Sequence, residues 1–344
     1  MSASSQLKRE IGLFSAIAIV VANMVGTGIF TTSGFILQEV GSSTALLWGW
    51  IIGGAFALCG ALCYGELGAR YPQAGGEYVY LREAFGKPVA FLSGWISLIV
   101  GFSAPIAAAA IAFATYLLRA VGATDGTNRV VEVFGASIFT LSLPVMLAIA
   151  VVLLISVLHV HSLRVGSRVQ NLLTLFKIVL VVGFIVAGLL SSRGSAGHFS
   201  GSFSAGTLLD GKFAVALIFI SFAYSGWNAA AYLGGEIKRP SRNIPLAMLV
   251  GTLIVIALYF LLNLVYVYAL PAAEMQGVME VAAAAGARLF GPGIGRWLNA
   301  AIALGLLSVL SAMILAGPRV YYAMSRDGIF FRLFGRVSDV RHTP

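Results

Sequence analysis

The sequence predicts an all-α, polytopic membrane protein with about eight transmembrane helices, two of them interrupted. Of the 344 residues, 59% are hydrophobic and only 10% are charged, and the mean hydropathy is +0.93. A water-soluble domain of this size could not bury so much apolar surface. Apolar stretches recur along the whole chain, and glycine breaks the first and the sixth at matching positions. These observations together favour a membrane transporter over a soluble protein.

Each apolar stretch is long enough to cross a hydrocarbon core of roughly 30 Å at 1.5 Å per residue. A cleavable signal peptide is the alternative for the first stretch, but that stretch is too long and lacks a small-residue cleavage pattern. No soluble domain separates the stretches. The predicted spans are 12–37, 42–69, 88–118, 140–160, 167–190, 211–235, 243–270 and 295–325.

The distribution of Lys and Arg predicts the orientation of the chain. Assigning the loops to alternate sides places 15 of the 22 Lys and Arg residues on the side that carries both termini and six on the other, with Lys177 inside a span. Cytoplasmic loops retain positive charge, so both termini are predicted to be cytoplasmic. The net charge of +9 is divided among short loops, which argues against a nucleic-acid-binding face.

The longest predicted connections between spans are 119–139, 191–210 and 271–294. Residues 70–87 contain a Pro-Gly turn and then a polar and aromatic stretch suited to the inner membrane interface. Residues 271–294 include EVAAAAGARLF, which predicts a short helix on the outer surface.

Several residues that could carry chemistry have simpler explanations. Cys59 and Cys63 are four apart within the second span, which favours a packed helix face over a metal site or a disulfide. Glu66 and Arg70 have the spacing of a structural ion pair. The four histidines lie at span ends or in loops without metal-ligand spacing, so we expect them to be solvated and predict no metal site; they are His159, His161, His198 and His342.

The first span, VVANMVGTGIF, is broken at Gly26, Thr27 and Gly28, and the sixth, FAYSGWNAAAY, is broken at Ser225 and Gly226. Gly226 follows Gly26 by 200 positions, and five spans separate the two starts, so the second unit enters the membrane from the opposite side. This predicts one transmembrane domain over 1–344, with a first inverted repeat at 10–190 and an incomplete second repeat at 211–344. Any single glycine here could serve helix packing instead. Paired breaks in inverted halves indicate the binding site of a secondary transporter.

The chemistry of an unwound helix indicates the ligand. Broken helices leave backbone groups without partners, at a cost of several kcal/mol each unless protein, water or ligand satisfies them. The half-helix after Gly28 would offer N–H groups to a carboxylate, and carbonyl groups at the end of the preceding half-helix and around Phe222 and Ala223 would suit an ammonium group. The pattern therefore predicts a zwitterionic α-amino acid. Trp227 and Tyr224 could cap or gate the ligand, or they could be interface anchors.

Lys177, in QNLLTLFKIVLVVGF, is the basic residue placed well inside a span, where a charge costs at least about 2.5–3.5 kcal/mol. One interpretation is that its amine replaces a coupling cation and meets polar groups of the first and eighth spans, such as Ser308 or Ser311. The alternative is that its side chain extends to the cytoplasmic interface.

Five blocks carry a family resemblance across nearly the whole chain: NMVGTGIF, YGELGARYPQAGGEYVYLREAFG, RVQNLLTLFK, FAYSGWNAAAYLGGEIKRPSRNIPLAM and LAGPRVYYAMSRDGIFF. In these blocks the sequence resembles the amino acid–polyamine–organocation transporters, and within them bacterial relatives of the L-type amino-acid transporters. The resemblance implies an inverted-repeat fold of five plus five helices, LeuT-like, with helices 1 and 6 broken.

The same resemblance assigns roles to individual residues. It implies that Gly26, Thr27 and Gly28 bind the substrate carboxylate. Phe222, Ser225 and Trp227 fall where the family binds the amino group and gates the site. Lys177 falls on the lysine that occupies the place of a sodium ion in sodium-independent members, and Tyr266 resembles a seventh-helix tyrosine near it.

Two departures from the family pattern lead to further expectations. Residues 119–139 contain no cysteine, so we expect no disulfide-linked heavy subunit. The family has more spans than the eight predicted here, and this sequence ends at SDVRHTP, where a ninth would begin. We therefore expect a truncated or partial chain, in which the second repeat keeps three of its five helices.

The expected function is secondary amino-acid transport across the cell membrane by alternating access, either proton-coupled or by exchange, without a cofactor. One alternative is a polyamine or cationic amino-acid carrier, which would need an acidic residue at the site, and none of the 13 Asp and Glu residues lies near either predicted break. Another is an amino-acid-binding membrane sensor. We predict no enzymatic activity, because the sequence shows no cluster of nucleophiles, metal ligands or paired carboxylates.

Overall fold

The computed structural model describes residues 7–123, 129–133, 136–161, 163–199 and 201–338. This part of the chain is helical apart from one antiparallel hairpin, formed by β1 (Arg129–Val133) and β2 (Ala136–Leu141). Seven helical segments are long and apolar enough to cross a membrane: Leu13–Thr31, Ser43–Arg70, Lys87–Val121, Leu143–His161, Leu163–Leu190, Pro240–Ala269 and Pro292–Arg326. The prediction of an all-α polytopic membrane protein is confirmed.

Both predicted breaks are present. The first span consists of α1 (Leu13–Met24), α2 (Gly28–Thr31) and α3 (Ser33–Val40). The predicted sixth span is divided into α11 (Gly211–Ala223) and α12 (Ala229–Tyr232), neither of which is long enough to cross a membrane alone. That division is the reason why seven spanning segments are found where eight were predicted.

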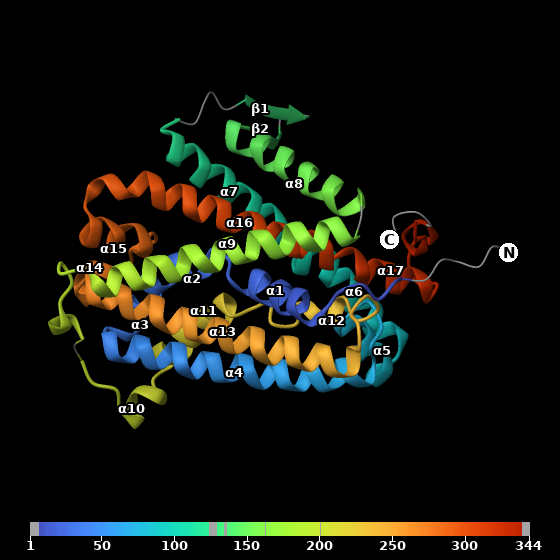
Figure 1. Cartoon of the computed structure of the whole chain (residues 1–344), viewed down its shortest axis with the longest axis horizontal. Coiled ribbons are helices and arrows are strands. Elements are labelled where there is room, and N and C mark those ends of the chain that lie inside the picture. The colour runs from blue at the N-terminus through green and yellow to red at the C-terminus, as the bar shows by residue number, and fades with distance from the viewer. Residues whose placement is uncertain (1–6, 124–128, 134–135, 162, 200, 339–344) are drawn as a thin grey trace.

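The uninterrupted spans surround the two broken helices. Helix α13 (Pro240–Ala269) lies beside α4 (Ser43–Arg70) over most of its length and also packs on α1. On the other side, α16 (Gly295–Ala316) packs against α7 (Ala104–Val121) and α9 (Leu163–Leu190), with α8 (Leu143–His161) outermost (Figure 1). The breaks therefore lie inside the bundle, where neighbouring helices can satisfy their backbone groups.

The third span changes its helical geometry in the middle. Helix α6 (Lys87–Ile96) continues into a π-helical segment, Ser97–Ser103, before α7 begins. Such π-helical turns are rare and are frequently found at functional sites. Here the segment places Gly101 and Phe102 in the wall of a central cavity.

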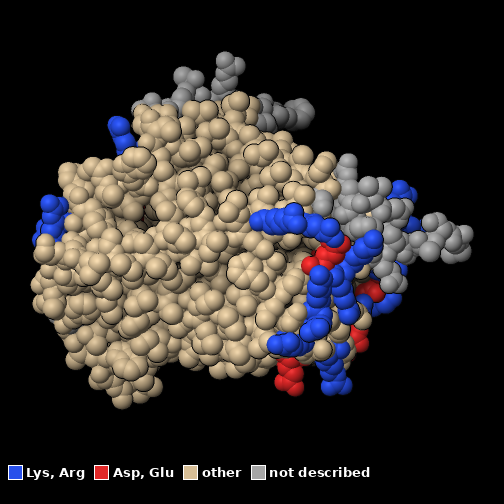
Figure 2. All heavy atoms as spheres, in the orientation of Figure 1, with Lys and Arg blue, Asp and Glu red and all other residues tan. Residues whose placement is uncertain are grey.

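Short helices cover the two ends of the bundle. The ends of the described chain, α5 (Glu77–Phe85) and α17 (Pro318–Arg326) lie at one end, and α14 (Ala272–Met275) and α15 (Val281–Phe290) lie at the other (Figure 1). Helix α15 is the short helix predicted within 271–294. Helix α10 (Ala205–Leu208) and the 3-10 turns at Ala196–His198, Pro292–Ile294 and Arg332–Gly335 complete the described elements. Most visible Lys and Arg side chains gather at the end with α5 and α17, as the loop assignment requires (Figure 2).

A buried ion pair that sequence reasoning missed fastens this end of the bundle. The Arg319 guanidinium donates from Nε and Nη2 to the two Glu236 carboxylate oxygens at 2.9 and 2.8 Å, and both side chains are at least 96% buried. The pair joins α17 to the segment after α12. A second group links α5 to the end of α17, because Tyr78 and Arg82 both donate to the Asp327 carboxylate.

Three expectations about single residues were wrong. Cys59 and Cys63 are free, as predicted, but they are exposed on the outer face of α4 instead of packed. Glu66 and Arg70 do not pair: both are exposed, and the Arg70 guanidinium lies 5.7 Å from the ring centroid of Tyr71.

The third concerns His159, which was expected to be solvated. It is buried on α8, and its Nε2 lies 2.8 Å from the Oγ atom of Ser311 on α16. His161 is exposed, His198 is half-buried with Nδ1 3.1 Å from the Tyr268 carbonyl, and His342 lies outside the described residues.

Candidate functional site

The two helix breaks lie against each other at the centre of the bundle. The Asn23 side-chain amide donates to the Gly226 carbonyl at 3.2 Å, across 203 residues of sequence. The Tyr259 hydroxyl of α13 lies 2.6 Å from the Met24 carbonyl and 3.1 Å from the Ala223 carbonyl. These are the last helical residues before each break, so one hydroxyl group joins both unwound segments.

A cavity of about 410 Å³ opens between the breaks and the third and eighth spans. It is large enough for an amino acid and its hydration water. All eight residues predicted to bind the substrate line this cavity: Gly26, Thr27, Gly28, Phe222, Ala223, Ser225, Gly226 and Trp227. Residues separated by about two hundred positions in sequence are thus brought to one site.

Glycine is required at two positions where the breaks meet. Gly226 has a φ of +103°, and a Cβ atom there would lie 2.7 Å from the Asn23 side-chain nitrogen. A Cβ atom on Gly28 would lie 3.1 Å from the Cα atom of Ala223. Any larger residue would strain the backbone or separate the two breaks.

The backbone groups at the first break are divided between protein and cavity. The Met24 carbonyl accepts from Tyr259, and the Gly26 amide donates to the same carbonyl at 2.9 Å. Gly28 begins α2, where the first amide groups of a helix have no intrahelical acceptor. The first break therefore offers amide donors at the cavity, while its carbonyl groups are largely used by the protein.

Lys177 donates to two further carbonyl groups at the end of α1. Its Nζ donates to the Ala22 carbonyl at 3.0 Å and to the Val25 carbonyl at 2.6 Å, and the residue is only 3% exposed. The alternative of an extended side chain at the interface is therefore wrong. The amine of α9 sits at the negative end of the α1 dipole, where a cation is favoured.

The serine partners expected for Lys177 bond elsewhere. The Ser308 hydroxyl donates to the Gly305 carbonyl, and Ser311 bonds to His159. Gly305 instead provides the contact with Lys177, because a Cβ atom there would lie 3.4 Å from Lys177 Cδ. Helix α16 thus packs on the lysine stem without a hydrogen bond from either serine hydroxyl to the amine.

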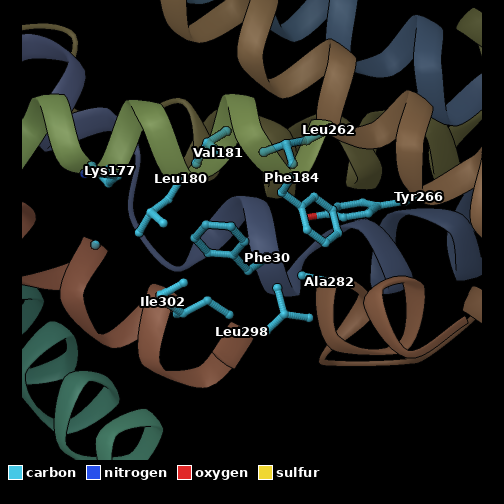
Figure 3. Close-up of a pocket in the computed structure, with 12 residues that line it drawn as sticks. Phe30, Lys177, Leu180, Val181, Phe184, Leu262, Tyr266, Ala282, Leu298 and Ile302 are labelled. Carbon is cyan, nitrogen blue, oxygen red and sulfur yellow. The ribbon is translucent and has the colours of Figure 1, made fainter. Parts of the chain in front are cut away.

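Lys177 and Tyr266 line a second, largely apolar cavity together with Phe30 of α2 (Figure 3). Tyr266 is fully buried, and its hydroxyl has no hydrogen-bond partner within the described chain. The bonds to the two breaks come instead from Tyr259, which lies seven residues before Tyr266 in α13. The family resemblance placed Tyr266 near Lys177, and the two residues do line one cavity, whereas sequence reasoning missed Tyr259 as the partner of the breaks.

Glu77, the first residue of α5, was missed as a site residue and lines the main cavity. Its carboxylate accepts hydrogen bonds from the Ser97 hydroxyl at 3.3 Å and from Tyr232 of α12. Burial raises the pKa of Glu77 above its ordinary value, and the two hydrogen bonds oppose this shift. The expectation that no acidic residue lies near the site was wrong, because the first residue of α5 forms part of the cavity wall.

Trp227 lines the cavity, and its ring packs against an aromatic residue of α4. It stacks edge-on against Tyr64 of α4, with ring centroids 4.9 Å apart, and Tyr64 stacks in turn on Tyr80. Tyr224 is buried and donates its hydroxyl to the Trp50 carbonyl. In this conformation both aromatic residues anchor the second break to α4.

Comparison with known proteins identifies the family. A family model described as amino acid permease matches residues 11–344. This chain belongs to the amino acid permease family. The interrupted helices and their shared cavity are thus those of a membrane-embedded, multi-pass amino-acid permease, and the relatives described below are transporters.

Three relatives show the range of the similarity. The chain is 32% identical over 343 residues to the human b(0,+)-type amino acid transporter 1, which covers 99% of this chain and 68% of the relative. It is 32% identical over 320 residues to the serine/threonine exchanger SteT of Bacillus subtilis, covering 93% of this chain and 68% of SteT. It is 30% identical over 349 residues to the mouse large neutral amino acids transporter small subunit 2, covering 98% of this chain and 62% of that protein.

Proposed function

We propose that this permease binds a zwitterionic amino acid between its two helix breaks and exchanges it across the cell membrane by alternating access. The observation that carries the proposal is that all eight predicted binding residues line one cavity. Exchange is favoured over one-way uptake because the similar bacterial protein SteT is a serine/threonine exchanger.

Within the proposed site, each end of the substrate has its own partners. Gly26, Thr27 and Gly28 would receive the carboxylate at the N-terminal end of α2, where amide groups and the helix dipole favour an anion. The carbonyl groups of Phe222 and Ala223, with Ser225 and Gly226, would receive the ammonium group. Trp227 would move with α12 when the cavity opens or closes.

Lys177 would replace a coupling cation in this scheme. The hydrogen bonds of its amine from α9 to the end of α1 support this role, because they occupy carbonyl groups that a cation would otherwise bind. Tyr266 would take part through the neighbouring cavity, whereas Ser308 and Ser311 would act only by packing α16 against the lysine.

The charged and cysteine residues at the surface indicate the orientation of the chain in the membrane and bear on a disulfide-linked partner. We place both termini in the cytoplasm, because the Lys and Arg side chains gather at that end. The permease would work without a disulfide-linked subunit, since its two cysteines lie within α4, on its exposed face. Labelling of an Arg332→Cys variant by a membrane-impermeant reagent from the outside would contradict this orientation.

The test is counterflow in proteoliposomes. Vesicles containing the purified permease are loaded with unlabelled serine, threonine, alanine, leucine or lysine, and entry of the same labelled amino acid is measured. The proposal predicts entry that depends on the internal amino acid. Amino-acid binding without entry under any loading condition would favour the sensor alternative, and entry that ignores the internal amino acid would exclude exchange.

A further inference from the structure

The wall of the substrate cavity contains a half-buried acid, Glu77, whose contacts the exchange mechanism does not explain. Glu77 is the one charged side chain among the described residues that line the cavity. It lies outside the membrane-spanning helices, at the start of α5, and it reaches the cavity beside the π-helical segment and α12.

Neutral groups surround the Glu77 carboxylate. Its donors are the Ser97 hydroxyl, at 3.3 Å, and the Tyr232 hydroxyl. The titratable groups that face it are Tyr64 of α4 and Tyr232 of α12. The charged groups on its own helix, Arg82 and Glu83, belong to the separate cluster around Asp327.

A half-buried carboxylate without a cationic partner loses part of its hydration, which disfavours its ionised form. Burial raises the pKa of Glu77 accordingly. Because the carboxylate lines a cavity, a proton can reach it without crossing the packed core. The site therefore has the geometry to bind a proton at a higher pH than an exposed glutamate would.

The Glu77 carboxylate also contacts α12, the helical segment after the second break. Tyr232 ends α12, and it donates to Glu77 while its oxygen accepts from the Asn228 side-chain amide at 3.1 Å. Phe102 of the π-helical segment stacks on the Tyr232 ring, with centroids 5.1 Å apart. Glu77 thus connects α5 and the π-helical segment to α12, next to Trp227 and Gly226.

We propose that Glu77 is a proton-binding site in the cavity wall, and that loss of its proton slows amino-acid exchange by fastening α12 to α5. The effect on exchange rests on the proposed function, whereas proton binding by Glu77 does not. A hydrogen bond to an ionised carboxylate is about twice as strong as one to a neutral acid, so protonation loosens the contact with Tyr232. Exchange is then faster when the proton is bound.

The first experiment tests the proton site without transport. Infrared difference spectra of the purified permease are recorded as pH rises from about 4 to about 8, a range that begins near the ordinary pKa of glutamate. A protonated carboxyl band that disappears above the usual glutamate range, and that is missing in Glu77→Gln, supports the site. An unchanged band in Glu77→Gln, or no such band in the parent, overturns it.

The second experiment tests the effect on exchange. With equal pH on both sides of the vesicle, the exchange rate of the parent rises roughly five- to tenfold as pH falls through the pKa of Glu77. Glu77→Gln, which is always neutral, exchanges at the low-pH rate at every pH. Tyr232→Phe removes the hydroxyl through which the ionised carboxylate holds α12, so its exchange stays near the low-pH rate at every pH, while the carboxyl midpoint in its infrared titration moves to higher pH. Glu83→Gln, an exposed acid on the same helix, keeps the parental profile.

The outcomes separate this inference from the proposed function. A parent that exchanges with a flat pH profile, or a Glu77→Gln variant with the parental profile, overturns the fastening role. A parent that shows no exchange at any pH refutes the proposed function, and the infrared titration still decides the proton site. Loss of all exchange in Glu77→Gln, with intact thermal stability, would show that Glu77 binds substrate instead.

Discussion

At the scale of single residues, two side chains donate hydrogen bonds to backbone carbonyl groups that lose their helical partners at the breaks. Lys177 supplies donors to Ala22 and Val25, and Tyr259 supplies one to Met24 and Ala223. Both residues come from uninterrupted helices, α9 and α13. The unwound segments thus depend on groups whose positions the rest of the bundle fixes.

Replacing Lys177 by Ala leaves the Ala22 and Val25 carbonyls buried without a donor. An unsatisfied buried group costs about 1–3 kcal/mol, so we expect amino-acid exchange to fall by about tenfold or more. Lys212→Ala, which removes an exposed lysine near the start of α11, should leave the rate unchanged. Counterflow measures both variants, and a Lys177→Ala variant with parental rate and parental pH dependence would refute a role for this amine.

The two tyrosines of α13 allow a matched comparison. Tyr259→Phe deletes the hydroxyl that bonds to both breaks and should reduce exchange about five- to thirtyfold, since a net contribution of about 1–2 kcal/mol is lost. Tyr266→Phe deletes a hydroxyl without a partner in the described chain and should change the rate less than twofold. Equal effects of the two substitutions on initial exchange rates would contradict the assignment.

At the scale of elements, most of the fold was predictable and its interior contacts were not. The spans, both breaks and α15 follow from apolar length and from glycine position, which are local properties of the chain. The eight lining residues also followed, because each break marks its own neighbours. Glu77, Tyr259 and the Glu236–Arg319 pair were missed because their roles depend on which helices meet, and no periodicity records that. The prediction that His159 is solvated was wrong for the same reason, because its position at a span end did not reveal its contact with Ser311 on α16.

The close contact of the two breaks gives a prediction about Gly226. Gly226→Ala introduces a Cβ atom at positive φ and against Asn23, which costs about 1–3 kcal/mol and should lower exchange several-fold or more. Gly183→Ala in α9 meets open space and should be neutral. Initial rates and thermal unfolding of both variants provide the check. Parental behaviour of Gly226→Ala would show that the breaks need not touch.

At the scale of the whole molecule, different contacts hold the helices together at the two ends of the bundle. The end rich in Lys and Arg is fastened by the buried Glu236–Arg319 pair and by the group around Asp327. At the other end, α15 packs on α2 and an ion pair between Glu280 and Arg119 joins it to α7. Alternating access would require one of these ends to loosen while the other holds.

The buried pair should dominate the stability of its end. Glu236→Gln leaves Arg319 buried without its counter-charge, and we expect the free energy of unfolding to fall by about 3–5 kcal/mol. Glu10→Gln disrupts a partly exposed pair with Arg164 and should cost less than about 1 kcal/mol. Unfolding in detergent measures both. Similar shifts for the two variants would show that burial of the Glu236 pair adds nothing.

The central claim, that an amino acid binds between the two breaks, can be tested at Ser225. This residue lines the cavity and is exposed, so a Ser225→Cys variant in a Cys59→Ala, Cys63→Ala background should react with a small thiol reagent. The measurement is the rate of that reaction with increasing amino acid. We predict that amino acids which exchange slow the reaction in a saturable way, while a Ser202→Cys control reacts at a constant rate. Exchange that proceeds without any protection of Ser225→Cys would contradict the site.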